Sequence, residues 1–211
     1  MYSSIKVYQT AITLHQSLIS RGFVNTLKWI YYGYFKANNF IVFYKNLTQP
    51  SPAGSTNTYV KCIRASLDTL RAIRGKEKET LPVEFYADTV HHLSTPYLAF
   101  LDDNVAAIHW LVYPGEESRF LTLLEGDVEI NYNTVLKEYR GRRIAESLMC
   151  FMINACQEEG QKRMFGVVHV SNIPQYKPML RLGFEPVEVL THFGLSRPKA
   201  SLKYIEKPGQ E

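Results

Sequence analysis

The part of this sequence most able to do chemistry is residues 135–148, which read VLKEYRGRRIAESL. Alternating side chains before it predict a β-strand over 128–135, and apolar residues at helical spacing predict a helix over about 142–159. The start of such a helix presents unpaired backbone N–H groups with a partial positive charge. Three arginines add to that charge: Arg140, Arg142 and Arg143. A strand, a tight turn at Gly141 and a helix start of this kind can bind a phosphate or diphosphate.

The strand before this turn carries groups suited to acid–base chemistry. Alternation puts two sets of side chains on opposite faces: Glu129, Asn131, Asn133 and Val135 on one, and Val128, Ile130, Tyr132 and Thr134 on the other. Glu129 is the first candidate for a general base, and His109 and His169 on neighbouring predicted strands are its rivals. The alternative role for Glu129 is that of a solvated or salt-bridged strand carboxylate.

Two motifs in this region resemble the GNAT superfamily of acetyltransferases. The family marks its cofactor loop with Arg or Gln, two residues, Gly, one residue, then Gly or Ala. Residues 140–145, RGRRIA, fit this pattern except that Arg143 replaces the central glycine. Asn172 is followed eleven residues later by Gly183-Phe184, at the spacing of the family's asparagine, short helix and Gly-Phe pair.

The resemblance covers roughly residues 59–205 and is most specific over 128–193. It implies an α/β (α+β) fold with a mixed, mostly antiparallel sheet of about six to seven strands, flanked by helices. A V-shaped split would separate the family's fourth and fifth strands, which are here 128–135 and 165–170.

The same resemblance implies where a cofactor would bind. It implies nine cofactor-binding residues: Val135, Lys137, Arg140, Gly141, Arg142, Arg143, Ile144, Ala145 and Asn172. Main-chain groups near the first two would pair with pantetheine, and the backbone amides of residues 142–145 would hold the pyrophosphate. The acyl donor would be acetyl-CoA or another acyl-CoA, and no metal takes part.

The sequence departs from the family at the position of its proposed general acid. Many members carry a tyrosine four residues before the Gly-Phe pair, and Met179 stands there in this chain. Tyr176, one helical turn earlier, and Tyr132 are the two candidates for protonating the departing thiolate.

The function implied is that of an acyl-CoA-dependent N-acyltransferase, with acetyl transfer to an amine as the expectation. The acceptor would be a small molecule, an amino sugar or a lipid-linked amine, reacting in a direct ternary complex. One alternative is a long-chain N-acyltransferase that takes its acyl group from acyl carrier protein. Another is a GNAT-fold sensor that binds CoA without turnover, which Met179 and Arg143 favour.

Composition predicts one globular domain with an extension, since 45% of the 211 residues are hydrophobic and 21% are charged. The first 67 residues hold seven basic and no acidic side chains, whereas the rest carries a net charge of −3, from 17 basic and 20 acidic residues. We therefore predict a basic helical extension and linker over 1–58 and an acyltransferase domain over 59–211. Short strands are also predicted at 40–44 and 120–124.

The extension suggests a contact outside the domain. A predicted helix at 21–36 places Lys28, Tyr32 and Lys36 on its polar face with Trp29 beside them, a composition suited to a lipid headgroup layer or a lipid-linked substrate. The alternative is that this helix packs on the domain or on a second subunit, as in a homodimer. Nucleic acid is not an expected partner, because the basic residues are few and no nucleic-acid motif is present.

The expected location is the cytoplasm, peripheral to the inner face of the membrane if the helix binds lipid. The sequence has no apolar run of about 20 residues and no compact signal-peptide core. Its three cysteines, Cys62, Cys150 and Cys156, have no CxxC spacing and are expected to be reduced, buried thiols.

Overall fold

The computed structural model describes residues 37–49, 59–76, 81–193 and 198–202, with the single positions Val24, Leu27 and Tyr31. Its contacts divide the chain into a larger compact unit, residues 40–190 and 199–211, and a smaller one, residues 1–39 and 191–198. Most of the predicted helix at 21–36 and of the predicted linker lies outside the described residues. The candidate site described below lies within the larger unit.

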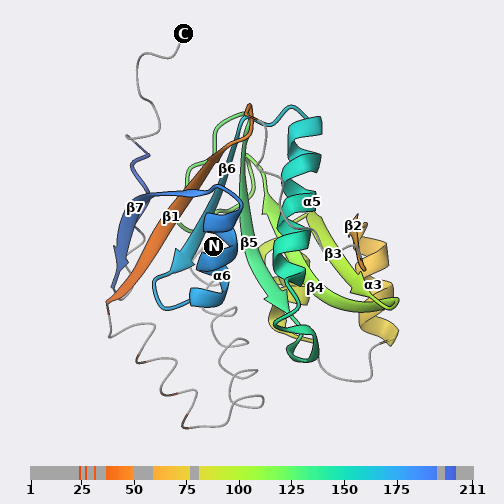
Figure 1. Ribbon diagram of the computed structural model, residues 1–211. Coiled ribbons are helices and arrows are strands. Elements are labelled where there is room, and N and C mark those ends of the chain that lie inside the picture. Colours follow the sequence, from red (N-terminus) through yellow and green to blue (C-terminus); the bar gives the residue numbers. More distant parts are fainter. Residues whose placement is uncertain are drawn as a thin grey trace, which may run out of the picture. The chain divides into compact units, whose positions relative to one another are not determined.

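A seven-stranded sheet forms the centre of the fold, in the order β2-β3-β4-β5-β6-β1-β7 (Figure 1). In chain order the strands are β1 (Asn38–Asn46), β2 (Val60–Arg64), β3 (Thr95–Leu101), β4 (Asn104–Val112), β5 (Asp127–Val135), β6 (Arg163–His169) and β7 (Glu185–His192). Strands β5 and β6 are parallel, whereas the pairs β2–β3, β3–β4, β4–β5 and β1–β6 are antiparallel. The predicted mixed and mostly antiparallel sheet of six to seven strands is confirmed.

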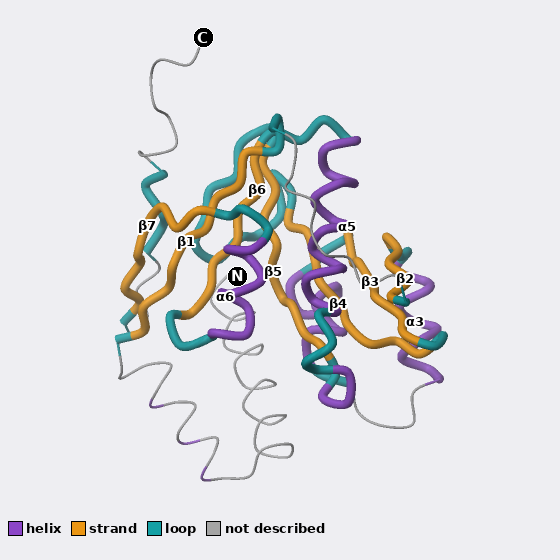
Figure 2. Tube along the Cα trace, in the orientation of Figure 1, coloured by secondary structure: helices purple, strands orange, loops and turns teal. Residues whose placement is uncertain are grey.

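Helices cover both faces of this sheet (Figure 2). One face packs against α5 (Ile144–Glu158) and α6 (Ile173–Arg181), and the other against α3 (Leu67–Lys76), the 3₁₀ turn η2 (Val83–Tyr86) and α4 (Ala87–His91). The buried stripe of α5 follows the helical spacing of its apolar residues, including Ile144, Leu148 and Met152, which are at most 1% exposed.

The split between β5 and β6 is visible in their register. The two strands pair over four residues, from Asp127 opposite Arg163 to Ile130 opposite Gly166. Beyond that point β5 continues to Val135 and β6 continues to His169 without pairing to each other. The strands therefore separate at Ile130 and Gly166, which confirms the predicted split.

Strand β1 lies at an unexpected place in the sheet. It pairs antiparallel with β6, from Phe40 opposite His169 to Asn46 opposite Arg163, and β7 lies on its other side. The predicted strand at 40–44 is thus confirmed, and it belongs to the same sheet as the strands after residue 59. The division of the chain at residue 58 stays a prediction, and this strand is the element that bears on it.

Two local predictions differ from the structure. The predicted strand at 120–124 is a loop, because Phe120 and Leu121 are buried by packing against Phe165 and Leu190 rather than by pairing in the sheet. The sequence also predicts a helix over 82–93, with Pro82 in its first turn, and in the structure this helix is shorter and irregular. It begins as the 3₁₀ turn η2 and ends at α4, where His92 adopts a left-handed conformation with φ 56°.

Candidate active site

The loop between β5 and α5 has the backbone geometry of an anion site. After the short 3₁₀ turn η3 (Lys137–Tyr139), Gly141 has φ 81° and Arg143 has φ 58°, so both lie in the left-handed region. The first intrahelical hydrogen bond runs from the N–H of Ser147 to the carbonyl of Arg143, at 3.1 Å. The N–H groups of residues 144–146 precede that bond and form the positive end of the helix.

The left-handed conformation explains the glycine of the family motif. At the position of that glycine, Arg143 is held at φ 58°, which costs a residue with a side chain roughly 1–2 kcal/mol. The arginine therefore keeps the same backbone shape as a glycine would, at some cost in stability.

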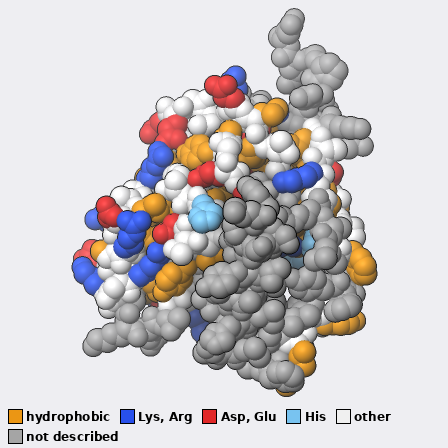
Figure 3. All heavy atoms as spheres, turned by 180° about the vertical axis from the view of Figure 1, so that it is seen from behind, with side chains coloured by type: hydrophobic (Ala, Val, Ile, Leu, Met, Phe, Trp, Pro, Cys, Tyr) orange, Lys and Arg blue, Asp and Glu red, His pale blue; other side chains and the backbone are white. Residues whose placement is uncertain are grey.

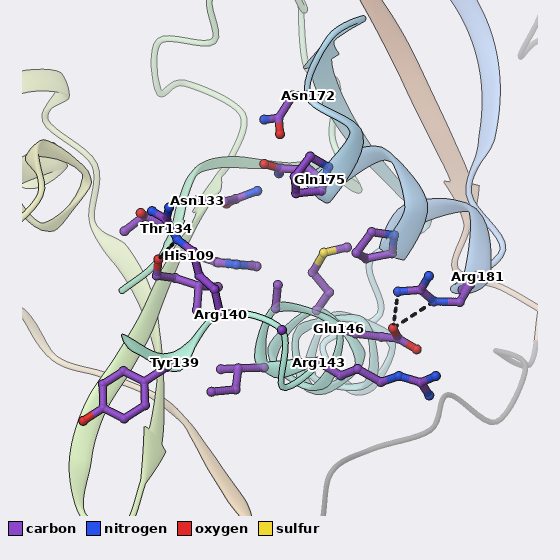
Figure 4. Close-up of a pocket in the computed structure, with 17 residues that line it drawn as sticks. His109, Asn133, Thr134, Tyr139, Arg140, Arg143, Glu146, Asn172, Gln175 and Arg181 are labelled. Carbon is purple, nitrogen blue, oxygen red and sulfur yellow. Dashed lines mark hydrogen bonds and ion pairs between the residues drawn. The ribbon is translucent and has the colours of Figure 1, made fainter. Parts of the chain in front are cut away.

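This loop opens into a pocket of about 630 Å³ between β5, α5 and α6 (Figure 4). It is lined by His109, Asn133, Thr134, Val135, Tyr139, Arg140, Gly141, Arg143, Ile144, Ala145, Glu146, Met149, Asn172, Pro174, Gln175, Pro178 and Arg181. The helix start and the unpaired part of β5 thus border the same space.

Seven of the nine predicted cofactor-binding residues line this pocket: Val135, Arg140, Gly141, Arg143, Ile144, Ala145 and Asn172. Lys137 and Arg142 are not among its lining residues. The Nε of Arg140 donates to the carbonyl of Val135 at 3.0 Å, so this arginine also closes the loop on the end of β5. The side chain of Arg143 reaches past the start of α5 (Figure 4).

Two buried polar atoms in the pocket lack a hydrogen-bond partner among the described residues: His109 Nδ1 and Asn133 Oδ1. His109 is 1% exposed, and burial lowers its pKa to about 3, so its ring stays neutral. Buried polar atoms are normally satisfied, so atoms left without a partner in a pocket are available to hydrogen-bond with a ligand or a water molecule.

A β-bulge on β5, opposite His109 of β4, turns the Asn133 side chain to the pocket. The register of β4 and β5 shifts between Ile108 and Trp110, and Tyr132 on β5 has φ 47°. The extra residue reverses the alternation along β5, so Asn133 faces the α5 side instead of sharing a face with Glu129 as predicted. A bulge depends on the partner strand, and the sequence of β5 alone carries no clear signal for it.

An ion pair between an exposed arginine and a buried glutamate lies at the pocket. Glu146, in the first turn of α5 and 4% exposed, accepts hydrogen bonds from Arg181 Nε at 2.9 Å and Nη2 at 2.7 Å (Figure 4). Arg181 is the last residue of α6, so the pair connects the ends of two helices that border the pocket. Neither residue could be recognised from the sequence, because their spacing along the chain shows no pattern.

Glu129 lies on the opposite face of the sheet from this pocket. It stands opposite Val112 on β4 and Phe165 on β6, both of which pack in the clusters away from α5. The side chain is fully buried. Its Oε1 accepts a hydrogen bond from Asn131 Nδ2 at 2.9 Å, and Oε2 has no partner of good geometry among the described residues.

The environment of Glu129 raises its pKa to about 7. Burial is the main cause, because it disfavours the charged form, and the Ser118 hydroxyl, the Lys199 ammonium and the Asn131 amide oppose it. A carboxyl group with this pKa can exchange a proton near neutral pH. It lies one residue before the point where β5 and β6 separate.

The two predicted acids lie in different surroundings. Tyr132 shares the face of Glu129 and stacks on His91 with ring centroids 4.1 Å apart, and burial raises its pKa to about 12. Tyr176 packs edge-on against Phe43 of β1, with centroids 5.4 Å apart, and does not line the pocket. Met179 is 1% exposed and is packed in the core against Gly166.

The remaining candidates are accounted for by their contacts. His169 lies at the end of β6, where its Nδ1 is 2.7 Å from the hydroxyl of Ser171, and its ring meets Phe40 edge-on. The three cysteines are free thiols, and burial raises the pKa of Cys62 to about 11 and of Cys156 to about 12. Thiols with such pKa values are poor nucleophiles.

The described part of the face opposite α5 carries acidic and basic side chains side by side, together with hydrophobic ones (Figure 3). Among the described residues, none of the helices is both long enough and apolar enough to cross a lipid bilayer.

With this geometry established, comparison with known proteins identifies the family. The sequence profile described as the Acetyltransferase (GNAT) family matches residues 63–184, which run from the end of β2 through β3 to β6, the β5–α5 loop, α5 and α6. The chain belongs to the GNAT acetyltransferase family. Members of this family generally use acetyl-CoA or another acyl-CoA as acyl donor.

Solved structures share the fold at low sequence identity. A GCN5-related N-acetyltransferase from Sphaerobacter thermophilus is 16% identical with a TM-score of 0.52, covering 81% of this chain and 56% of its own. A protein assigned to the GNAT acetyltransferases from Novosphingobium aromaticivorans is 15% identical with a TM-score of 0.51, covering 74% and 63%. A Drosophila protein is 11% identical with a TM-score of 0.52, covering 81% and 56%.

This GNAT chain therefore spans between 56% and 63% of the length of those three structures. No curated protein matches it. These matches establish the family and the fold of the chain. The acceptor is inferred from the chemistry of the site.

Proposed function

We propose that this protein transfers an acetyl group from acetyl-CoA to a primary amine within a ternary complex. The observation that carries the proposal is the pocket beside the β5–β6 split. It is lined both by the positive start of α5 and by two buried polar atoms, His109 Nδ1 and Asn133 Oδ1, that have no partner in the part of the chain that the structure describes. Such a pocket suits a long ligand with an anionic end and an amide-bearing arm.

The residues present fit the acyl donor. The backbone N–H groups of residues 144–146 and the side chains of Arg140 and Arg143 would hold its phosphates. Asn133 Oδ1 would accept a hydrogen bond from an amide of the pantetheine arm, and the neutral His109 ring would offer Nδ1 as a second contact. When bound, the donor supplies a thioester, whose carbonyl carbon is the electrophile.

Glu129 is the proposed general base. The acceptor would approach from the face opposite α5, where Glu129 lies one residue before the split. The carboxylate would take a proton from the attacking amine, directly or through one water, as the new C–N bond forms. Its pKa of about 7 leaves it largely ionised just above neutral pH.

Tyr132 is the proposed proton donor for the departing thiolate. It shares the face of Glu129, and its phenol stays protonated at physiological pH because burial raises its pKa to about 12. Tyr176 is the second candidate, from its place on α6. A thiolate is a good leaving group, so we expect loss of the acid to cost less activity than loss of the base.

An amino sugar or a lipid-linked amine is the proposed acceptor, with action in the cytoplasm at the inner face of the membrane through residues 21–36. Binding of the protein to anionic liposomes at low salt, reduced at moderate salt, would support the lipid contact, and no binding at either would end it. Sedimentation would test the proposed homodimer.

The test of the enzyme is thiol release from acetyl-CoA over a panel of amines, with longer acyl-CoAs in parallel. We expect turnover, and we expect E129Q to lower kcat/KM by about 10²- to 10⁴-fold. The matched control is E125Q, an exposed glutamate in the turn before β5, which should leave kcat/KM unchanged. Equal activity of E129Q and wild type would rule out Glu129 as the base.

A CoA-binding sensor is the second candidate, favoured by one observation. Met179, at the position of the family's proposed acid, is buried against Gly166 rather than exposed in the pocket. Calorimetry with CoA separates the two functions. Tight binding without thiol release from any amine would favour the sensor, and no binding would contradict both.

A further inference from the structure

A short segment near the C-terminus holds the loop beside Glu129. We call residues 199–202 the strap. The Nζ of Lys199 donates to the carbonyls of Ser118 at 2.7 Å and Leu121 at 3.0 Å. The N–H of Ala200 donates to the carbonyl of Phe120 at 2.8 Å. Three carbonyls of one loop are therefore held by two adjacent residues of the strap.

The loop itself is buried and internally hydrogen-bonded. The hydroxyl of Ser118 accepts from the N–H of Leu121 at 3.0 Å. Ser118, Phe120 and Leu121 are each at most 5% exposed, and the two apolar residues pack with Phe165 on the face that carries Glu129. A buried carbonyl that loses its donor is costly, so the position of the loop depends on Lys199.

The other end of the strap is fixed on β7. Glu188 accepts hydrogen bonds from the N–H of Ser201, at 3.0 Å to Oε2, and from the N–H of Leu202 at 3.3 Å. The hydroxyl of Ser201 donates to the same carboxylate oxygen at 3.3 Å. The strap thus connects an outer strand of the sheet to the loop beside the proposed base.

We propose that Lys199 is a positioning residue for the acyl transfer. Its ammonium holds the 118–121 loop by hydrogen bonds, and its positive charge stabilises the buried Glu129 carboxylate. The proposal rests on the proposed function, in which Glu129 is the base. Lys199 does not touch the reacting atoms in this scheme and acts through Glu129.

The charge of Lys199 affects the ionisation of Glu129 because the side chains next to this carboxyl are apolar or neutral. Its neighbours on the adjoining strands, Val112 and Phe165, are apolar. Asn131 and Ser118 are neutral, and the Tyr132 phenol stays protonated. Arg119 and Glu117, in the same loop as Ser118, carry opposite charges and act on Tyr132 with opposite signs. Burial disfavours the ionised form of Glu129, and the positive charge of the Lys199 ammonium favours it.

The sign of the expected effect follows from this balance. Without the ammonium, the carboxylate is harder to form, so the pKa of Glu129 rises and the active ionised form appears at higher pH. We expect K199M to move the rising limb of the kcat/KM profile upward by roughly one pH unit. K199R, which keeps the charge, should retain the wild-type profile.

Three further variants make the test specific. K61M, at an exposed lysine on β2, is the matched control and should leave the profile in place. K199Q lacks the charge but can still donate to a loop carbonyl, so it replaces K199M if that variant does not fold. E129Q should lose the limb altogether. The affinity for CoA should be unchanged in every Lys199 variant, because Lys199 does not line the pocket.

An unchanged profile in K199M and K199Q would overturn the proposal. A shift of the rising limb to lower pH would also overturn it. Such a shift would mean that water reaches Glu129 through a loosened loop and that the charge of Lys199 has no part in setting the pKa of Glu129. A ¹³C NMR titration of the Glu129 carboxyl in the same proteins measures the pKa without turnover. It decides the role of Lys199 even if no amine is acylated, which separates failure of this proposal from failure of the proposed function.

Discussion

The two arms of the sheet, on either side of the split, are assembled in different ways. The first arm, β2-β3-β4-β5, follows the chain in order, and its neighbouring strands are antiparallel (Figure 1). The second arm, β6-β1-β7, takes its middle strand from the N-terminal part of the chain. The first arm therefore depends on contacts between consecutive strands, and the second on contacts between distant segments.

This contrast indicates which part of the site is held only by neighbouring segments of the chain. The first arm carries Glu129, Asn133 and His109 on strands joined to their sequence neighbours. The second arm supplies the other side of the split, and β6 is held there by β1 once it leaves β5. Removing β1 should therefore affect the site more than any single substitution on the first arm.

The largest expected effect comes from removing β1. A chain that begins at residue 59 should lose cooperative folding, because β6 and β7 would each lose a paired neighbour. Thermal denaturation followed by near-UV circular dichroism measures it. A chain that begins at residue 37 keeps β1 and is the control. A chain starting at residue 59 that melts like the control would show that the second arm does not need this strand.

The next effect tests the edge of the first arm. The pKa of Glu129 is about 7 when folded, above its ordinary value, so the carboxyl contributes stability at low pH that is lost as the pH rises toward 7. E129Q should therefore be more stable than wild type by about 2–3 kcal/mol at pH 8.5 and nearly equal at pH 4. Urea denaturation at both pH values measures this.

E125Q is the control for that comparison, because Glu125 is exposed. It should show no difference of this size at either pH. If E129Q is destabilised at pH 8.5, the carboxylate is satisfied in solution and the buried position of Glu129 does not raise its pKa.

A smaller effect is expected at the edge of the second arm. Gly166 is the last residue of β6 that pairs with β5, and a Cβ built there would overlap the terminal methyl of Met179. G166A should lower the free energy of unfolding by about 1–3 kcal/mol. The double variant G166A/M179L, with a shorter side chain opposite, should recover part of this loss. Equal stability of G166A and wild type would show that the methionine moves aside freely.

The smallest effect lies in the loop that joins the arms. R143G should raise the stability by about 0.5–1 kcal/mol, because glycine adopts the left-handed backbone there without strain but gains freedom in the unfolded chain. R142G is the matched control, since the backbone of Arg142 is not in the left-handed conformation. The stability of this variant should be lowered or unchanged. Equal destabilisation of the two variants would contradict the strain at Arg143. Thermal denaturation of both variants measures the difference.

The same contrast explains what could be predicted from the sequence. The β5–loop–α5 unit is encoded by neighbouring residues, so the periodicity of its side chains and the glycine at its turn predicted it. Seven of the nine cofactor-binding residues that the GNAT resemblance implies line the pocket, and six of these seven lie in this unit. The strand at 40–44 was also evident, although its place between β6 and β7 was not.

The parts that escaped prediction depend on distant partners. The bulge at Tyr132 needs the register of β4, and it is this bulge that turns Asn133 toward the pocket. Arg181 and Lys199 gain their significance from contacts with Glu146 and with the 118–121 loop, which no spacing along the chain reveals. Phe120 resembled a strand residue because a buried loop has the same apolar composition.

The ion pair between Glu146 and Arg181 has a consequence for how fast a ligand would leave. The Glu146 carboxylate already pairs with Arg181, so a polyanion that binds in the pocket must compete with it for this guanidinium. The ion pair therefore reduces the electrostatic free energy that Arg181 can contribute to binding the anion. When the anion dissociates, the Glu146 carboxylate can pair with the Arg181 guanidinium again. We therefore expect a short residence time for spent CoA, which favours repeated turnover over tight storage.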